Sequence, residues 1–177
     1  MPSADVLAHA LRTIPDFPKP GIQFKDITPI LSDPTLLDTA VAALVEPYTE
    51  ADITKVVGVE ARGFILGPLL ARELNAGFVP VRKEGKLPHS THTETYALEY
   101  GTDTVEMHVD ALTPVDRVLL HDDVLATGGT AAATMRLIQR SNATLHGFSF
   151  LVELAFLDGR AALDDSLPFH SVLSVEG

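Results

Sequence analysis

Two carboxylates and a glycine pair stand close together in the stretch HDDVLATGGTAA, from His121 to Ala132. Thr127-Gly128-Gly129-Thr130 leads straight into an Ala-rich segment that is typical of a helix. Free backbone N–H groups and the positive end of the helix dipole favour an anion at such a start. Glycines let the backbone close around that anion. The stretch is therefore compatible with a phosphate-binding loop. The alternative is an ordinary capped helix after a flexible turn.

Asp122 and Asp123 change what such a loop would bind. Adjacent carboxylates beside a bare phosphate are costly unless cations or hydroxyl donors meet them. A phosphorylated sugar satisfies both demands, because its phosphate lies on the glycine loop while its ring hydroxyls donate to the carboxylates. Mg²⁺ fits the same neighbourhood, since it bridges phosphate oxygens and keeps several waters. The alternative for this pair is a solvated turn.

A second turn, Glu60-Ala61-Arg62-Gly63, follows the buried run KVVGV. In open parallel sheets, ligands bind beyond the carboxyl ends of the strands, where we expect both turns to lie. The chain has no Walker A loop and no G-x-G-x-x-G fingerprint, and Gly58 to Gly63 is followed by Phe64 rather than Lys. Nucleoside triphosphatase and dinucleotide oxidoreductase functions therefore lack their phosphate-binding elements.

Strands alternating with helices must position these turns. The apolar runs KVVGV, GFVPVRK, RVLL and GFSFLVELAFL predict strands, and helical patterns follow the first and third. This alternation predicts an α/β fold with a largely parallel twisted sheet flanked by helices, in one domain over residues 1–177. TETYALEYGTDTVEMHVD alternates polar and apolar residues about Gly101 and predicts an antiparallel hairpin or flap.

The N-terminal part has clear helix signals and many prolines. SADVLAHALRTI, residues 3–14, carries a helical apolar stripe that ends in the Pro-broken stretch IPDFPKPGIQF. A second helix is expected to begin with Asp33 as N-cap and Pro34 at its first position, and to stop at Pro47.

Composition excludes several classes of function. The formal net charge is −11, with the acidic residues spread along the chain, which disfavours nonspecific nucleic-acid binding. No cysteine is present, so no disulfide, thiolate nucleophile or Cys-type zinc site is expected. His89 and His92 lack a nearby third ligand, and His121 is expected to be a hydrogen-bonded packing residue. The absence of a secretory-type start or a long apolar run predicts a cytosolic protein.

The stretch VLLHDDVLATGGT resembles the phosphoribosyl-pyrophosphate motif of the type I phosphoribosyltransferase family. FPKPGIQFKDITPIL, VVGVEARGFILGP, VPVRKEGKLP and YALEYG resemble, in this order, the family members that use adenine. The resemblance implies a small N-terminal hood, a flexible flap and transfer of a 5-phosphoribosyl group to N9 of adenine, giving AMP and diphosphate in purine salvage. It further implies Mg²⁺ bound mainly through substrate and a cytosolic homodimer. The net charge and the lack of a long apolar run predict that neither nucleic acid nor a membrane is a partner.

The resemblance also implies residue roles. The 5-phosphate would lie on Ala126, Thr127, Gly128, Gly129 and Thr130, and the ribose hydroxyls on Asp122 and Asp123. The diphosphate would meet Glu60, Ala61, Arg62, Arg82, Lys83 and Lys86. Adenine would stack on Phe24 and be read by backbone groups of Gln23 and Lys25. Glu99 would handle a proton or stabilise charge, Tyr100 would close the site, and Arg62 would assist catalysis.

The residues alone leave plainer interpretations open. Arg62, Arg82, Lys83 and Lys86 are compatible with surface charges, Glu99 and Tyr100 with solvent-facing strand positions, and Phe24 with the core. A phosphoribosyltransferase for xanthine or another purine would share the sugar-phosphate site. A regulator that binds phosphoribosyl pyrophosphate while gripping DNA or RNA would need a basic face or an added helix-turn-helix region.

Overall fold

The computed structural model describes residues 3–97 and 101–176, which fall into two compact units, residues 1–43 and 44–177. The expectation of a single domain over the chain stays a prediction. Within the described ranges, no helix is both long and apolar enough to cross a membrane.

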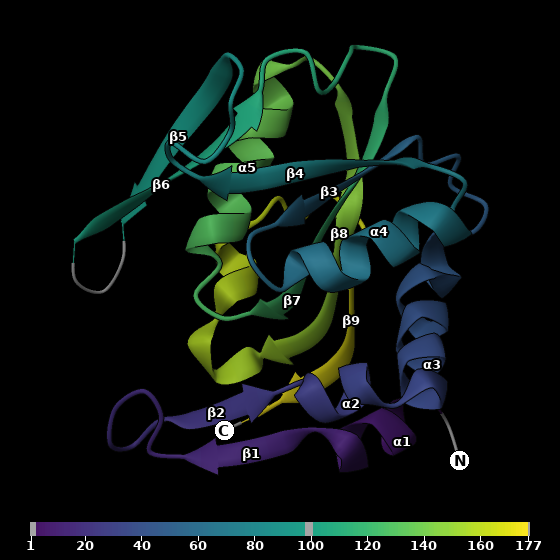
Figure 1. Cartoon of the computed structure of the whole chain (residues 1–177), viewed down its shortest axis with the longest axis vertical. Coiled ribbons are helices and arrows are strands. Elements are labelled where there is room, and N and C mark those ends of the chain that lie inside the picture. Colours follow the sequence, from purple (N-terminus) through teal and green to yellow (C-terminus); the bar gives the residue numbers. More distant parts are fainter. Residues whose placement is uncertain (1–2, 98–100, 177) are drawn as a thin grey trace. The chain divides into compact units, whose positions relative to one another are not determined.

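The larger unit holds a seven-stranded sheet in the order β5-β6-β4-β3-β7-β8-β9 (Figure 1). Strands β4, β3, β7, β8 and β9 are parallel neighbours, and β5 and β6 join the edge of the sheet antiparallel. The bounds are β3 Lys55–Val59, β4 Gly77–Lys83, β5 Thr91–Ala97, β6 Thr102–His108, β7 Arg117–Leu125, β8 Thr144–Leu154 and β9 Phe169–Val175. The predicted largely parallel α/β sheet is confirmed, whereas β9 was not predicted.

Helices cover both faces of this sheet. α4 (Gly63–Glu73) packs on the face where Phe78 contacts the backbone near Gly58 and Gly67. α5 (Gly129–Arg140) covers the opposite face, because its buried residues share one apolar cluster with Leu120 and Phe148. Short 3-10 helices lie at η1 Glu46–Tyr48, η2 Ala155–Leu157 and η3 Gly159–Ala162. The two strand–turn–helix units, β3 to α4 and β7 to α5, therefore place the two turns at the carboxyl ends of neighbouring parallel strands.

The predicted flap begins as a regular hairpin. β5 and β6 pair from Thr91↔His108 to Ala97↔Thr102, and residues 98–100 lie outside the described ranges. Glu94 in β5 accepts ion pairs from Arg136 at 3.1 Å and Arg140 at 2.5 Å, both in α5. The base of the hairpin is thus fastened to the helix that begins at the glycine loop.

The N-terminal unit corrects one sequence prediction. The helix expected over residues 3–14 is shorter than predicted. It spans Ser3–Ala10 as α1, and Arg12–Pro15 forms strand β1. β1 pairs antiparallel with β2 (Gln23–Asp26), so cross-strand pairing overrides the helical spacing of Leu11 and Ile14. α2 (Thr28–Ser32) follows.

The next helix confirms its predicted start. α3 (Pro34–Val45) begins after Asp33, whose Oδ1 accepts the backbone N–H groups of Thr35 at 2.8 Å and Leu36 at 3.1 Å. This is the N-cap that the sequence indicated. Pro47 then lies in η1, directly after the helix.

Candidate active site

The two turns meet because β3 and β7 are parallel neighbours with Gly58 opposite His121. Arg62, the N-cap residue of α4, places its Nε 2.8 Å from Oδ2 of Asp123. One expectation is wrong: Asp122 and Asp123 lie inside β7 rather than in the turn, because Val124 and Leu125 continue the strand. The turn itself is only Ala126 to Gly128.

The carboxylate pair sits in a costly electrostatic environment. Asp123 is only 3% exposed, and burial raises its pKa against the opposing charge of Arg62. Burial and the neighbouring charge of Asp123 raise the pKa of Asp122 well above its usual range. Such carboxyl groups gain from hydroxyl or metal partners that stabilise their charged form. The pair is therefore poised to accept hydrogen bonds from a ligand.

The loop after the carboxylates has the geometry of an anion site. Gly128 has φ +80° and caps α5, so the first N–H groups of the helix face the turn. The loop lines an open pocket with about 320 Å³ of empty space. Its lining residues are Asp122, Val124, Leu125, Ala126, Thr127, Gly128, Gly129, Thr130, Ala131 and Phe150. Every residue predicted to hold the sugar phosphate, except the buried Asp123, lines this pocket.

A residue that the sequence did not single out shapes the loop from behind. A Cβ atom on Gly159 would overlap the carbonyl oxygen of Ala126 and lie 3.1 Å from the nitrogen of Gly128. A Cβ on Gly128 would in turn overlap the carbonyl oxygen of Gly159 and lie 3.0 Å from Cβ of Ala162. The start of η3 thus fits against the loop backbone with no room for a side chain.

On the other side of the site, Glu60 organises the predicted diphosphate residues. Its carboxylate accepts Nε and Nη2 of Arg82 at 3.1 and 3.2 Å, and the backbone N–H of Lys83 at 3.0 Å. The bond from Arg82 lowers the pKa of Glu60 despite partial burial. Nη1 of Arg82 donates to the carbonyl of Lys86 at 3.1 Å. Arg82 therefore has a structural role in addition to its predicted contact with diphosphate. The peptide bond from Glu60 to Ala61 is cis.

Glu106 in β6 holds the loop that carries Lys86. It is 3% exposed and accepts the backbone N–H groups of Lys86 and Leu87, each at 2.8 Å, and the hydroxyl of Thr91 at 3.2 Å. Burial alone would raise the pKa of Glu106, but the N–H donors from the loop lower it. The side chain of Lys86 itself is exposed.

His121 behaves as expected of a packing residue. It is fully buried, and its Nδ1 lies 3.0 Å from the carbonyl oxygen of Ser149, so this nitrogen carries the hydrogen. Burial lowers the pKa of His121 to about 4. The ring is therefore neutral near pH 7.

The predicted adenine residues gather in the N-terminal unit. Phe24 is half-buried in β2, with its ring edge-to-face to Phe17 at a centroid distance of 5.2 Å. Gln23 is exposed in the same strand, and Nζ of Lys25 donates to the hydroxyl of Thr13 at 2.9 Å. Glu99 and Tyr100 lie outside the described residues.

Strand β7 of a largely parallel sheet thus carries two carboxylates toward a glycine loop at the start of α5. The family model described as "Phosphoribosyl transferase domain" matches residues 33–163. The class of protein is therefore that of the phosphoribosyltransferases.

Individual relatives narrow the class. The chain is 55% identical over 170 residues to the adenine phosphoribosyltransferase of Acidothermus cellulolyticus, covering 94% of this chain and 96% of the relative. It is similar to the crystal structure of that enzyme from Rhodothermus marinus, with a TM-score of 0.93, 60% identity and 98% of each chain covered. The Saccharomyces cerevisiae enzyme, solved with an imino-altritol bisphosphate and adenine, has a TM-score of 0.91 and 42% identity, covering 97% of this chain and 98% of its own. The chain belongs to the adenine phosphoribosyltransferase family.

Proposed function

We propose that this protein transfers the 5-phosphoribosyl group of 5-phospho-α-D-ribose 1-diphosphate to N9 of adenine, forming AMP and diphosphate in purine salvage. The observation that carries this function is the pair Asp122 and Asp123, which leads through a glycine loop into the N-terminus of α5. Family membership supports adenine as the acceptor.

The sugar phosphate would be divided between two kinds of group. Its 5-phosphate would lie on the backbone N–H groups from Ala126 to Thr130, with the hydroxyls of Thr127 and Thr130 as further donors. Its 2- and 3-hydroxyls would donate to Asp122 and Asp123. Hydrogen bonds from these hydroxyls favour the charged form of each carboxyl, which offsets the penalty that burial imposes in the unliganded protein.

Departure of diphosphate needs positive charge at the leaving group. Arg62, Lys83 and Lys86 would supply it. Glu60 would hold the end of β4 at Lys83, and Arg82 would hold the following loop through the carbonyl of Lys86. Bond cleavage at C1 develops oxocarbenium character, so nearby carboxylates stabilise the ring while the cations stabilise the leaving oxygens.

The acceptor base would be bound by the N-terminal unit. Phe24 would stack on adenine, and backbone groups of Gln23 and Lys25 would read its Watson–Crick edge. Glu99 would handle the proton or the charge at the base, and Tyr100 would close the site. Closure of an active site excludes water during the transfer.

The donor set around the pocket fits Mg²⁺ bound mainly through substrate. Within residues 3–97 and 101–176 no group of three or more His, Asp or Glu side chains could cage a metal ion. Asp122 lines the pocket and the buried Asp123 follows it in β7, and Mg²⁺ pairs readily with one or two carboxylates, waters and substrate oxygens. Bound there, it would neutralise charge on the diphosphate. We further propose a cytosolic homodimer, as the family resemblance implies, that binds neither nucleic acid nor membrane.

The test begins with purified protein, adenine, phosphoribosyl pyrophosphate and Mg²⁺, and the expected product is AMP. Asp122→Asn combined with Asp123→Asn should lower turnover by roughly 100-fold or more, because each carboxylate loses a charge-assisted hydrogen bond to the ribose. The matched control is Asp116→Asn, which removes a buried carboxylate that accepts hydrogen bonds from Thr54 and Thr113 just before the same strand. It should lower the melting temperature but leave turnover intact.

Two results would contradict the proposal. Turnover of guanine or orotate in place of adenine would overturn the choice of base. Wild-type rates in the double asparagine variant would overturn the ribose role of the carboxylates.

A further inference from the structure

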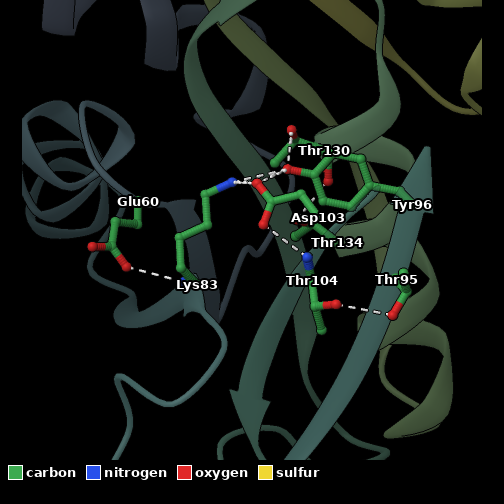
Figure 2. A network of polar contacts seen from close by, with 8 residues as sticks. All are labelled: Glu60, Lys83, Thr95, Tyr96, Asp103, Thr104, Thr130 and Thr134. Carbon is green, nitrogen blue, oxygen red and sulfur yellow. Dashed lines mark hydrogen bonds and ion pairs between the residues drawn. The ribbon is translucent and has the colours of Figure 1, made fainter. Parts of the chain in front are cut away.

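The phenol of Tyr96 joins three different elements at one oxygen atom (Figure 2). Nζ of Lys83, at the end of β4, donates to this oxygen at 3.0 Å. The hydroxyl of Thr130, in the first turn of α5, also donates to it at 3.0 Å. The phenol donates in turn to Oδ2 of Asp103 in β6 at 3.3 Å. One hydroxyl in the hairpin thus contacts both sides of the proposed substrate site.

These contacts use the full capacity of the hydroxyl group. A phenol has one hydrogen to donate and lone pairs for two acceptor bonds, and all three are engaged here. Lys83 also forms an ion pair with Asp103, whose Oδ1 accepts the backbone N–H of Thr104 at 2.8 Å. Burial lowers the pKa of Lys83, but the bonds from Asp103 and Tyr96 more than compensate, so its pKa is raised and it stays charged.

The position of the phenol is fixed by its surroundings. Tyr96 is only 7% exposed, and its ring lies 3.2 Å from where a Cβ on Gly129 would be. Two residues earlier in β5, Glu94 is paired with Arg136 and Arg140 of α5. The ring of Tyr96 therefore contacts the start of α5. Its strand, β5, is also bound to the later turns of α5 through Glu94.

The consequence is an upper limit on the spacing between two anion-binding donors. Nζ of Lys83 and the hydroxyl oxygen of Thr130 can be no farther apart than the sum of their distances to one atom. Lys83 is the proposed diphosphate ligand, and Thr130 is a proposed 5-phosphate ligand. A rotating hydroxyl can also exchange donor and acceptor roles, so Thr130 can turn its hydrogen to a phosphate if Tyr96 turns its single hydrogen from Asp103 to the oxygen of Thr130. Asp103 would then still be paired with Lys83.

We propose that Tyr96 is a positioning residue that sets the distance between Lys83 and Thr130, so that the site selects a sugar with an anionic group at each end. This inference rests on the proposed function. It places a determinant of donor-substrate affinity in the flap hairpin, near the turn end of its strand pairing and outside the phosphate loop. Phosphoribosyl pyrophosphate, which needs both donors, should depend on Tyr96 strongly, and adenine should not.

The test is Tyr96→Phe, which keeps the packing on Gly129 and removes only the hydroxyl. We expect the dissociation constant of phosphoribosyl pyrophosphate, measured by calorimetry, and its KM to rise about tenfold, the effect of a lost hydrogen bond to a charged partner. The KM of adenine and kcat at saturation should stay unchanged. In Lys83→Ala the further substitution of Tyr96 should add little, because Tyr96 acts partly through Lys83.

Tyr48→Phe is the matched control, since the Tyr48 hydroxyl donates to the carbonyl of Phe148 at 2.6 Å in the core. It should lower stability without changing either KM. The inference is overturned if Tyr96→Phe behaves like this control. It is also overturned if Tyr96→Phe weakens the binding of phosphoribosyl pyrophosphate and of adenine to the same extent. Binding is measured without turnover, so the two proposals can fail separately. Wild-type protein that binds phosphoribosyl pyrophosphate but makes no AMP would overturn the proposed reaction. Weaker binding of phosphoribosyl pyrophosphate by Tyr96→Phe would still support the spacing role in that case. Wild-type protein that does not bind it would overturn both.

Discussion

The loop from Ala126 to Gly128 and the segment from Arg82 to Leu87 are both proposed to bind phosphate groups, yet they are built differently. The loop offers mainly backbone N–H groups, and its shape depends on the contact of Gly128 with Gly159. The segment offers the side chains of lysines, and its shape depends on the carboxylates of Glu60 and the buried Glu106, which bind its backbone.

The two regions also respond to pH in opposite directions. Near the loop, Asp122 and Asp123 have raised pKa values, so their contribution to folding is present at acid pH and is lost as pH rises. In the other segment, Glu60 and Glu106 have lowered pKa values, so their contribution is present at neutral pH and is lost on acidification. The first region is arranged for a ligand at a cost to the fold, whereas the second stabilises the fold itself.

The largest effect should come from filling the space behind the loop. Gly159→Ala places a methyl group against the carbonyl of Ala126, so the loop must shift. We expect kcat/KM for phosphoribosyl pyrophosphate to fall roughly 100-fold, because displacement of a binding group by about 1 Å has effects of this order. Steady-state kinetics with varied phosphoribosyl pyrophosphate measures it.

Gly21→Ala is the control for that change, since Gly21 has φ +88° and open space where its Cβ would be. It adds backbone strain in a turn but meets no neighbouring atom. A Gly159→Ala variant with wild-type affinity for the substrate would show that the loop does not depend on this contact, and the contrast between the two regions would fail.

A smaller effect is expected from Glu106→Gln in the other region. The neutral amide keeps the shape but weakens the hydrogen bonds from Lys86 and Leu87. We expect a loss of about 1–3 kcal/mol in the free energy of unfolding and a rise of about tenfold in the KM of phosphoribosyl pyrophosphate. Urea unfolding and kinetics measure the two quantities. A loss of stability with no change in that KM would mean that the buried carboxylate does not position the lysine.

The same contrast explains how much of the site the sequence could reveal. The strand–turn–helix units around Glu60–Gly63 and Asp122–Thr130 are contiguous, so alternating patterns and glycines predicted them. The strand boundary at Asp122 was misplaced, because polar residues there resembled a turn while the pairing of β7 with β8 continues to Leu125. β1 was read as helix for the related reason that strand pairing is not local.

Residues that act across elements left no signal of these contacts in the sequence. Tyr96, Asp103 and Glu106 occupy ordinary positions in an alternating hairpin, and only the fold brings them to Lys83 and to the loop of Lys86. Gly159 lies in a part of the chain whose pattern indicated nothing, and its role follows solely from its contact with Ala126 and Gly128. Proximity between distant segments is a property of the packed structure.

The smallest effect should be a gain. Asp122→Asn removes a carboxyl whose ionisation burial and Asp123 oppose, so the unliganded protein should become more stable by about 1 kcal/mol. The raised pKa fixes the sign: wild-type protein loses this contribution as pH rises, so the gain in melting temperature should be largest near pH 7–8 and shrink toward pH 4. Thermal melts of both proteins across that range measure it, and their difference cancels the other carboxylates. With phosphoribosyl pyrophosphate and Mg²⁺ present the order should reverse, since only the wild-type carboxylate gains the ribose bond. A variant less stable than wild type without ligand would show that Asp122 serves the fold, and the two regions would then be alike.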